Sequence, residues 1–374
     1  MKFIVFGEDW QSHPSSTQHI FKELAKSHDI VWINSIGMRK PTIKLLDVKR
    51  VFYKLKSLVL KKRHTEESAD KHSKLKDHTL PILPWHDNKL VKAFNKWIFN
   101  KKPFVDNEPI IYWVSVPTAI YLINLRPIDK IVYYCGDDFS ALAGVDHLMV
   151  EPLERELILK ADLIYVVSEF LSSKMPKHKV KLLSHGVDFD LFNNKKQKAV
   201  ELSNINKPVI GFYGSLNAWL DKELLQKLAL ERPQYQIMLI GNIIENFDSL
   251  LSLNNVSHVP AVEHHKLATF SQHWHVSILP FVDNAQIRAC DPLKLKEYLA
   301  TGTPIVSTNF AAVRPYQEAV LIADSMNAFI ERVDYAISIS DEQKLNWRQT
   351  QADYAKNHSW QVKALQISDE LGLG

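Results

Sequence analysis

Residues 291–306 read DPLKLKEYLATGTPIV, and their pattern predicts a helix that is followed at once by a buried strand. Pro292 suits the first turn of a helix, where its missing N–H costs nothing. Gly302 is suited to end that helix, and Pro304 opens the apolar run of the next strand. An apolar run at 276–279 comes before the helix. The stretch is therefore a strand, a loop, a helix and a strand, which is the unit from which parallel sheets are built.

The same alternation extends over the whole chain of 374 residues, which is too long for one ordinary core. It predicts an α/β protein of two doubly wound, Rossmann-like domains, at 1–195 and 205–357. The polar stretch 193–208 is expected to join them, and a helix at about 358–374 is free to pack back on the first domain. Strands are expected at 3–6, 29–33, 109–114, 130–134, 163–167, 209–213, 236–240, 276–279 and 304–307, with helices at 16–27, 117–124, 149–160, 220–231 and 293–301.

Composition excludes several classes of protein. The two cysteines, Cys135 and Cys290, form neither a disulfide framework nor a Cys/His cluster, so we expect a reducing compartment and no structural zinc. The apolar run at 3–6 breaks at Gly7 and is too short for a signal peptide. Because no apolar stretch approaches the roughly 20 residues of a membrane span, we expect a cytoplasmic protein, with a peripheral membrane location left open.

Two segments of the second half have the features of a phosphate and ribose site. Gly214 and Ser215 follow the strand at 209–213, and a glycine there lets backbone amides approach a phosphate closely. Asp291, Pro292 and Leu293 open the helix of 291–306, whose amino end favours a diphosphate. Lys294 adds a positive charge in its first turn. Glu297 lies three residues later, where a carboxylate can take both hydroxyls of a ribose.

At these residues the chain resembles glycosyltransferases of the GT-B fold. The pattern Pro-x-Lys-x-x-Glu-Tyr-Leu-Ala-x-Gly-x-Pro-x-Val matches 292–306, and 211–216, 219–221 and 232–233 are similar to the family-4-type bacterial enzymes that build capsule, teichuronic acid and exopolysaccharide. The resemblance implies a nucleotide-diphosphate sugar as donor, UDP- or GDP-linked, held by the second domain. It also implies a central cleft, no cofactor and no metal.

The chain departs from that family at one position. Many retaining members carry a second glutamate eight residues before the ribose-binding one, and here that position is Ala289. We therefore look for the catalytic group in the first domain, at Asp137 and Asp138. These carboxylates follow the strand at 130–134, as in inverting GT-B enzymes such as the xanthan glucuronosyltransferase. Two adjacent acids repel, so one is suited to act as a base while the other caps a helix.

Other strand ends carry further candidates for binding the acceptor. Glu169 follows the strand at 163–167, where it binds the sugar or orients the base, while Ser168 is equally suited to cap a helix. The first strand–helix loop contains His13, Ser15, Ser16 and His19, which we expect to contact the acceptor. The two histidines have no apparent third ligand, so a metal site is not expected. In the turn 184–188, Gly186 is expected to allow a left-handed conformation and Asp188 to cap, with His185 as a turn histidine.

Charge is unevenly distributed along the chain. Residues 39–102 carry 18 Lys and Arg against 6 Asp and Glu, although the net charge of the whole chain is only +4. Within that segment, 42–63 is cationic and amphipathic. It suits a helix that lies on an anionic membrane surface, or one that packs on the first domain with a solvated basic face. Nucleic acid is not expected as a partner because no recognition motif accompanies the charge.

Together these features predict an enzyme that moves a sugar from a nucleotide-diphosphate donor to a glycan or lipid-linked acceptor hydroxyl in bacterial surface polysaccharide synthesis. An aspartate serves as the general base. Three alternatives remain open: a retaining GT-B transferase, a nucleotide-sugar 2-epimerase, and a non-catalytic GT-B scaffold subunit. Loss of the glutamate at Ala289 favours the last slightly, whereas Lys294, Glu297 and the aspartate pair favour an enzyme.

Overall fold

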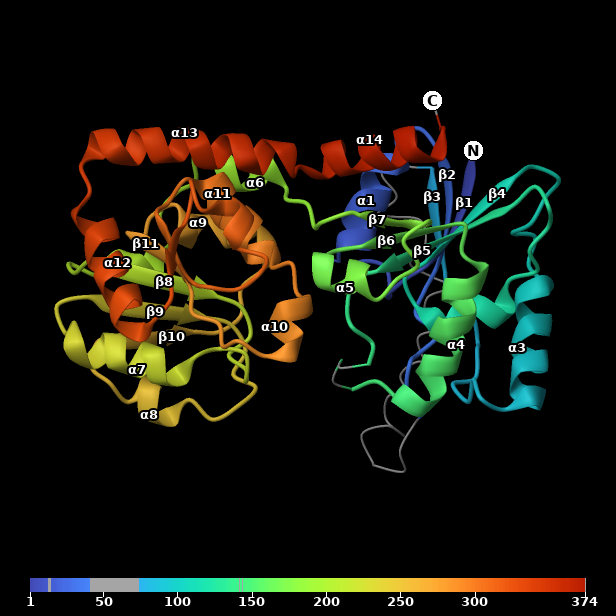
Figure 1. Ribbon diagram of the computed structural model, residues 1–374, viewed down its shortest axis with the longest axis horizontal. Helices are drawn as coiled ribbons and strands as arrows, with labels where there is room; N and C mark the ends of the chain where they lie inside the picture. Colours follow the sequence, from blue (N-terminus) through green and yellow to red (C-terminus); the bar gives the residue numbers. More distant parts are fainter. Residues whose placement is uncertain (13–14, 41–73, 141, 143, 374) are drawn as a thin grey trace. The chain divides into compact units, whose positions relative to one another are not determined.

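The computed structural model describes residues 1–12, 15–40, 74–140, 142 and 144–373 (Figure 1). It divides into unit 1, Met1–Leu183 with Lys363–Gly374, and unit 2, Ser184–Val362. The boundary expected at 193–208 therefore lies earlier, between Leu183 and Ser184. The reason is that helix α6 (Phe189–Asn193) packs on α11 (Leu293–Thr301) of unit 2, and Phe192 is fully buried in the core of that unit.

The described part of unit 1 holds a seven-stranded parallel sheet in the order β3-β2-β1-β4-β5-β6-β7. Its central strand β4 is buried along its whole length, as expected for a strand covered on both faces. The elements are β1 (Lys2–Phe6), α1 (Ser16–Leu24), β2 (Asp29–Ile33), β3 (Leu75–His78), α3 (Lys89–Asn100), β4 (Ile110–Val114), η2 (Pro117–Leu122), β5 (Lys130–Cys135), α4 (His147–Lys160), β6 (Leu163–Val166), α5 (Glu169–Ser173) and β7 (Val180–Leu182).

Unit 2 is built around a six-stranded parallel sheet in the order β10-β9-β8-β11-β12-β13. Helices α7, α8 and α12 form one layer, and α6, α9 and α11 form another (Figure 1). The strands are β8 (Val209–Tyr213), β9 (Gln236–Ile240), β10 (Val256–Val259), β11 (Val276–Leu279), β12 (Ile305–Thr308) and β13 (Leu321–Ala323). The helices are α6, η3 (Val200–Leu202), α7 (Lys222–Glu231), α8 (Asp248–Leu251), η4 (His264–Lys266), α9 (Ala268–Ser271), α10 (Ala285–Ala289), α11 (Leu293–Thr301), η5 (Arg314–Tyr316), α12 (Met326–Ser338) and α13 (Asp341–Asn357). The last helix, α14 (Trp360–Leu371), begins in unit 2 and belongs to unit 1 from Lys363 onward.

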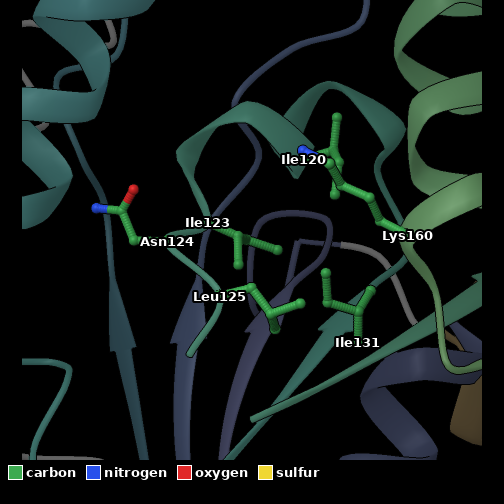
Figure 2. A pocket seen from close by; sticks show the side chains of 6 residues that line it. All are labelled: Ile120, Ile123, Asn124, Leu125, Ile131 and Lys160. Carbon is green, nitrogen blue, oxygen red and sulfur yellow. The ribbon is translucent and has the colours of Figure 1, made fainter. Parts of the chain in front are cut away.

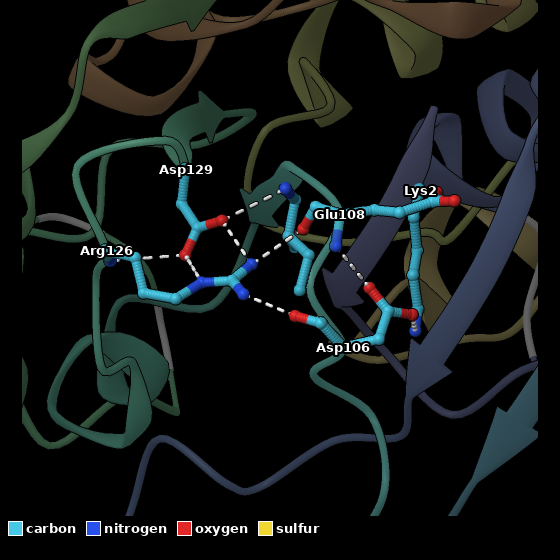
Figure 3. A network of polar contacts seen from close by, with 6 residues as sticks. Lys2, Asp106, Glu108, Arg126 and Asp129 are labelled. Carbon is cyan, nitrogen blue, oxygen red and sulfur yellow. Dashed lines mark hydrogen bonds and ion pairs between the residues drawn. The ribbon is translucent and has the colours of Figure 1, made fainter.

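A polar network fixes the amino end of β4 in unit 1 (Figure 3). Asp129, whose side chain is fully buried, accepts hydrogen bonds from the Ile110 N–H at 3.0 Å and from the Arg126 guanidinium at 2.7 and 2.8 Å. Burial disfavours the charged form of Asp129, but these bonds outweigh it and hold the pKa of the carboxyl below its usual value. Arg126 also donates to the backbone carbonyls of Asp106 and Glu108. The network ties the turn before β5 to the loop before β4.

Several expected elements differ from those observed. Residues 117–124 were expected to be helical, and Pro117–Leu122 is a helix of the 3₁₀ type, which suits a short connector beginning at proline. Strand β3 and helix α3 both lie within 39–102 and were not among the elements expected from the sequence. Gly186 was expected in a left-handed turn, yet it is not among the glycines with positive φ. It is small for another reason, because a Cβ there would lie 2.5 Å from the Trp360 ring.

Candidate functional site

The carboxyl ends of β8 and β9 in unit 2 are closely packed around two glycines. Gly214 follows β8 with φ +139°, and Gly241 follows β9 with φ +144°. A Cβ on Gly241 would lie 2.1 Å from the Gly214 carbonyl oxygen. A Cβ on Gly214 would lie 2.1 Å from Cε of Lys294 and 2.8 Å from its Nζ. Glycine at 214 is therefore required by its positive φ, and a Cβ there would also push aside the end of the Lys294 side chain; Gly241 is required by its positive φ and by the backbone of Gly214.

Lys294 lies in the first turn of α11, and the end of its side chain crosses Gly214. Its Nζ stands 5.9 Å from the centre of the Phe212 ring and makes no hydrogen bond or ion pair within the described residues. Removal from water lowers the pKa of the ammonium, while the negative charge of Glu297 opposes that shift. The N-cap of α11 is Pro292, which supplies no side-chain cap to the first N–H groups of the helix. The positive end of the helix dipole therefore adds to the positive potential around the Lys294 ammonium.

Glu297 lies one turn further along α11 and is 7% exposed. One of its oxygens accepts a hydrogen bond of 2.7 Å from His264 Nε2. The buried Tyr213 hydroxyl is near the same carboxylate but makes no hydrogen bond of good geometry to a described residue. Burial and the nearby Glu297 charge hold the pKa of Tyr213 well above its usual value. The carboxylate is thus oriented by a histidine.

Sequence reasoning missed His264, Tyr213 and Gly241 as parts of this site. His264 belongs to a 3₁₀ turn after β10, a strand whose sequence, Val256–Val259, alternates too briefly to stand out. Gly241 could have been found from the sequence, because a lone glycine directly after an apolar strand indicates that another backbone segment approaches closely there.

Asp291 has a structural environment that differs from the donor contact expected of it. One carboxylate oxygen forms a buried ion pair with Lys296, and the other accepts a hydrogen bond of 2.7 Å from the His185 N–H. Lys296 is fully buried and lies 5.5 Å from the Tyr316 ring. With both oxygens occupied, Asp291 connects the start of α11 to the 184–188 turn. In that turn Asp188 caps α6, as predicted.

The remaining expected donor residues lie around Lys294. Ser215 follows Gly214 and is half-buried, Pro292 is buried as the N-cap of α11, and Leu293 is the first residue of that helix. Ala289 is the last residue of α10 and is 5% exposed. The structure thus brings Gly214, Lys294 and Glu297 together on one edge of the sheet, with Ser215, Pro292 and Leu293 adjacent in sequence.

Asp137 and Asp138, which follow β5 in unit 1, have opposite environments. Asp138 accepts hydrogen bonds from Lys174 at 2.5 Å and from Ser140 Oγ at 2.6 Å. Desolvation opposes these bonds, but they outweigh it and lower the pKa of Asp138. The Asp137 carboxylate has no partner among the described residues, and desolvation together with the charge of Glu8 raises its pKa. Water screens part of this effect, since Asp137 as a whole is exposed.

The other candidates of unit 1 lie along the same edge of the sheet. Ser15 caps α1 and donates a hydrogen bond of 2.9 Å to Glu8, which follows β1. Ser16 is buried, and His19 is half-buried within α1. Glu169 is exposed at the start of α5, whose N-cap is Ser168 as one reading of the sequence predicted. His13 and the cationic segment 42–63 lie outside the described residues.

A cavity of about 480 Å³ lies elsewhere in unit 1 (Figure 2). It is bounded by η2, the start of β5 and the last residue of α4, Lys160, which pairs with Glu156 at 2.6 Å. Because Ile131 at the amino end of β5 lines it, the cavity is at the opposite end of that strand from Asp137. We therefore do not include it in the candidate site. It is lined by Ile120, Ile123, Asn124, Leu125, Ile131 and Lys160.

No cluster of three or more His, Cys, Asp or Glu side chains among the described residues is arranged to hold a metal ion. No helix in the described part of the chain has the length and apolar character to cross a membrane.

Comparison with known proteins places this geometry in context. No family model matches the chain. It is 24% identical over 292 residues to the putative teichuronic acid biosynthesis glycosyltransferase TuaH of Bacillus subtilis (strain 168), covering 72% of this chain and 73% of that one. Its fold matches the structure described as trehalose-6-phosphate from E. coli bound with UDP-2-fluoro glucose, with a TM-score of 0.68, 12% identity and 99% of both chains covered.

Two further structures match over nearly their whole length. Anabaena Alr3699/HepE in complex with UDP and glucose has a TM-score of 0.66 at 12% identity, covering 100% of both chains. Sucrose-phosphate synthase from Thermosynechococcus elongatus has a TM-score of 0.67 at 13% identity, covering 100% of this chain and 98% of that one. The chain has the fold of the GT-B glycosyltransferases. The expected fold of two Rossmann-like units is thereby confirmed for this GT-B chain.

Proposed function

We propose that this chain is a glycosyltransferase that takes its sugar from a nucleoside diphosphate bound at the carboxyl edge of the unit 2 sheet. One observation carries the proposal: an ammonium that has no acceptor in the described structure lies across Gly214, at the uncapped start of α11. A diphosphate supplies the anionic oxygens that such a cation and helix end attract. Glu297, with one oxygen held by His264, is placed to accept hydrogen bonds from ribose hydroxyls.

The donor is proposed to be UDP-linked. Two of the matching structures contain UDP or a UDP-sugar, which is a property of those proteins that we extend to this chain. The Bacillus relative is named for teichuronic acid biosynthesis, so the proposed acceptor is a hydroxyl of a glycan or a lipid-linked glycan in bacterial surface polysaccharide synthesis. The location proposed for this activity is the cytoplasm.

For the chemical step we propose that Asp137 of unit 1 is the general base. Its carboxylate has no hydrogen-bond donor among the described residues, whereas Asp138 is held by Lys174 and Ser140. The acceptor oxygen attacks the anomeric carbon, its proton passes to Asp137, and the bond from that carbon to the phosphate oxygen breaks. Lys294 and the start of α11 stabilise the diphosphate as it leaves. Buried Ala289 and the ion-paired Asp291 leave neither position with a carboxylate available to the sugar.

The donor site is tested by measuring UDP affinity calorimetrically for Lys294→Ala. Loss of a charge-assisted contact of about 1.5–3 kcal/mol should weaken binding by roughly 10- to 100-fold. Lys344→Ala on α13 is the matched control, because that lysine is only half-buried and lies outside the site. Gly214→Ala should also weaken binding, since a Cβ would displace the Lys294 side chain. Unchanged UDP affinity in Lys294→Ala would refute the proposed diphosphate site.

Product stereochemistry and reaction with donor alone separate the remaining enzymes. Inversion at the anomeric carbon, followed by NMR, is expected if Asp137 acts as the base, whereas retention would contradict that mechanism. Conversion of the donor sugar in the absence of any acceptor would instead indicate a 2-epimerase. A scaffold subunit would bind UDP without consuming a UDP-sugar.

A further inference from the structure

Helix α3 in unit 1 presents an apolar stripe to solvent. Leu90, Phe94 and Trp97 are spaced by four and three residues, so they lie on one face of the helix. They are 82%, 45% and 52% exposed. The rings of Phe94 and Trp97 stack with centres 5.9 Å apart. Large side chains that are exposed together in this way indicate a surface made for a partner.

The opposite face of α3 holds the helix firmly on unit 1. Asn95 is fully buried, accepts a hydrogen bond of 2.9 Å from the Leu83 N–H and donates one of 2.8 Å to the Leu83 carbonyl. Phe99 is 2% exposed and packs against Phe6 and Phe104. Asn88 caps the helix. The stripe is therefore a fixed feature of the folded unit rather than a helix end that unwinds.

The charge around the stripe is of one sign. Residues 89–102 contain five lysines and no acidic residue. In the described structure none of these five lysines forms an ion pair, and Lys101 Nζ stands 3.7 Å from the centre of the Trp97 ring. The acidic residue just before the helix, Asp87, is bound to Lys40 at 2.7 Å. Positive charge beside exposed aromatic rings complements an anionic, partly apolar surface.

Helix α4 of the same unit shows that exposed leucines alone do not make such a surface. Leu148 and Leu159 are 88% and 76% exposed, more than Phe94 or Trp97. The basic residues of α4 are neutralised, however, because Arg155 pairs with Glu151 at 2.7 Å and Lys160 with Glu156 at 2.6 Å. The combination of aromatic rings and uncompensated lysines distinguishes α3.

We propose that α3 docks unit 1 on an anionic lipid bilayer, with Leu90, Phe94 and Trp97 entering the interface and the flanking lysines facing lipid phosphates. The occupant is a membrane rather than a protein because the stripe is narrow and its charge is of one sign, which suits a planar array of anions. Docking does not rest on the proposed sugar transfer and can be measured without any substrate.

The test is sedimentation of the full chain with vesicles of phosphatidylcholine, with and without phosphatidylglycerol. Wild-type protein should bind the anionic vesicles and release them at high salt. Phe94→Ser/Trp97→Ser should bind at least about tenfold more weakly, and Lys89→Glu/Lys96→Glu should lose the preference for phosphatidylglycerol. Leu148→Ser/Leu159→Ser on α4 is the matched control and should bind like wild type.

Several results would overturn the proposal. Failure of the wild-type protein to sediment with anionic vesicles is one of them. Equal binding by the α3 variants and wild type is another, and it would assign any membrane binding to another part of the chain, such as 42–63. Dissociation of a dimer by Phe94→Ser/Trp97→Ser, without vesicle binding by wild type, would make the stripe an interface between copies. A second readout is the quenching of tryptophan fluorescence by brominated lipid. Quenching should be strong in wild type and weaker in Trp97→Phe, a substitution that keeps the stripe apolar and aromatic.

Discussion

At the scale of single residues, Asp137 and Asp138 show how two neighbouring carboxylates acquire different chemistry. The sequence indicates a reactive pair after a strand but not which member acts, because the deciding contact comes from Lys174, 36 residues further along the chain. A residue distant in sequence gives no signal at the aspartates themselves. The same holds for Glu297, where the ribose-binding carboxylate was predicted but its partner His264 was not.

The proposed roles of the pair predict opposite consequences of substitution. Asp137→Asn should lower the transfer rate by roughly 10²- to 10⁴-fold, since a general base is lost, with UDP affinity unchanged. In wild type the rate should fall as pH drops through the raised pKa of Asp137, because the base must be deprotonated to act. Rate against pH, measured at saturating donor, is the check.

Asp138→Asn is the companion variant. It removes the acceptor charge from Lys174 and should lower the melting temperature more than Asp137→Asn does, while reducing the rate less. A larger loss of rate in Asp138→Asn than in Asp137→Asn would assign the base to Asp138 and contradict our proposal.

At the scale of elements, the central strands were predictable and the peripheral ones were not. Strands such as β1, β4 and β8 are buried on both faces and appear in the sequence as continuous apolar runs. Strand β3, with the sequence LKDH, is only partly buried, and its place in the sheet depends on pairing with β2 rather than on its own composition. Tertiary pairing of this kind leaves little trace in the local sequence.

The network at the start of β4 predicts a measurable contribution to the stability of unit 1. Asp129→Ala removes a buried carboxylate that accepts bonds from Ile110 and Arg126, and should lower the free energy of unfolding by about 1–3 kcal/mol. Because the folded state lowers the pKa of Asp129, its contribution is complete above the pKa of the unfolded chain and is lost as pH falls through the folded value.

Urea unfolding of wild type and Asp129→Ala at several pH values measures this contribution. The difference between them should be constant near neutrality and shrink in acid. A difference that persists unchanged at pH values well below the folded pKa would show that the carboxylate charge contributes nothing.

At the scale of the whole molecule, unit 1 is assembled from two separate parts of the chain. Residues Lys363–Gly374 belong to it, although Ser184–Val362 come between. Glu370 accepts a hydrogen bond of 2.6 Å from Tyr165 of β6, and Gln366 donates to the Leu182 carbonyl of β7. Ile367 is fully buried, whereas Leu365 is 63% exposed. The sequence left open whether this helix returns to the first domain, since its composition does not specify a partner.

This return predicts a localised effect. Ile367→Ala should destabilise unit 1 by about 2–5 kcal/mol through the cavity that it creates, while Leu365→Ala should change stability by less than about 0.5 kcal/mol. In hydrogen exchange, amides of β6 and β7 should lose protection in Ile367→Ala while those of β8 and β9 keep it. Equal loss of protection in both units would argue against an assignment of this segment to unit 1 alone.

The same connectivity has a consequence for co-translational folding on the ribosome. Domains generally fold as they emerge, with the amino-terminal one first. Here the segment that covers β6 and β7 is translated only after all of unit 2. Unit 1 is synthesised first, but part of its apolar surface stays uncovered until translation has passed Val362. Nascent chains stalled before that point should therefore be recognised by chaperones at β6 and β7.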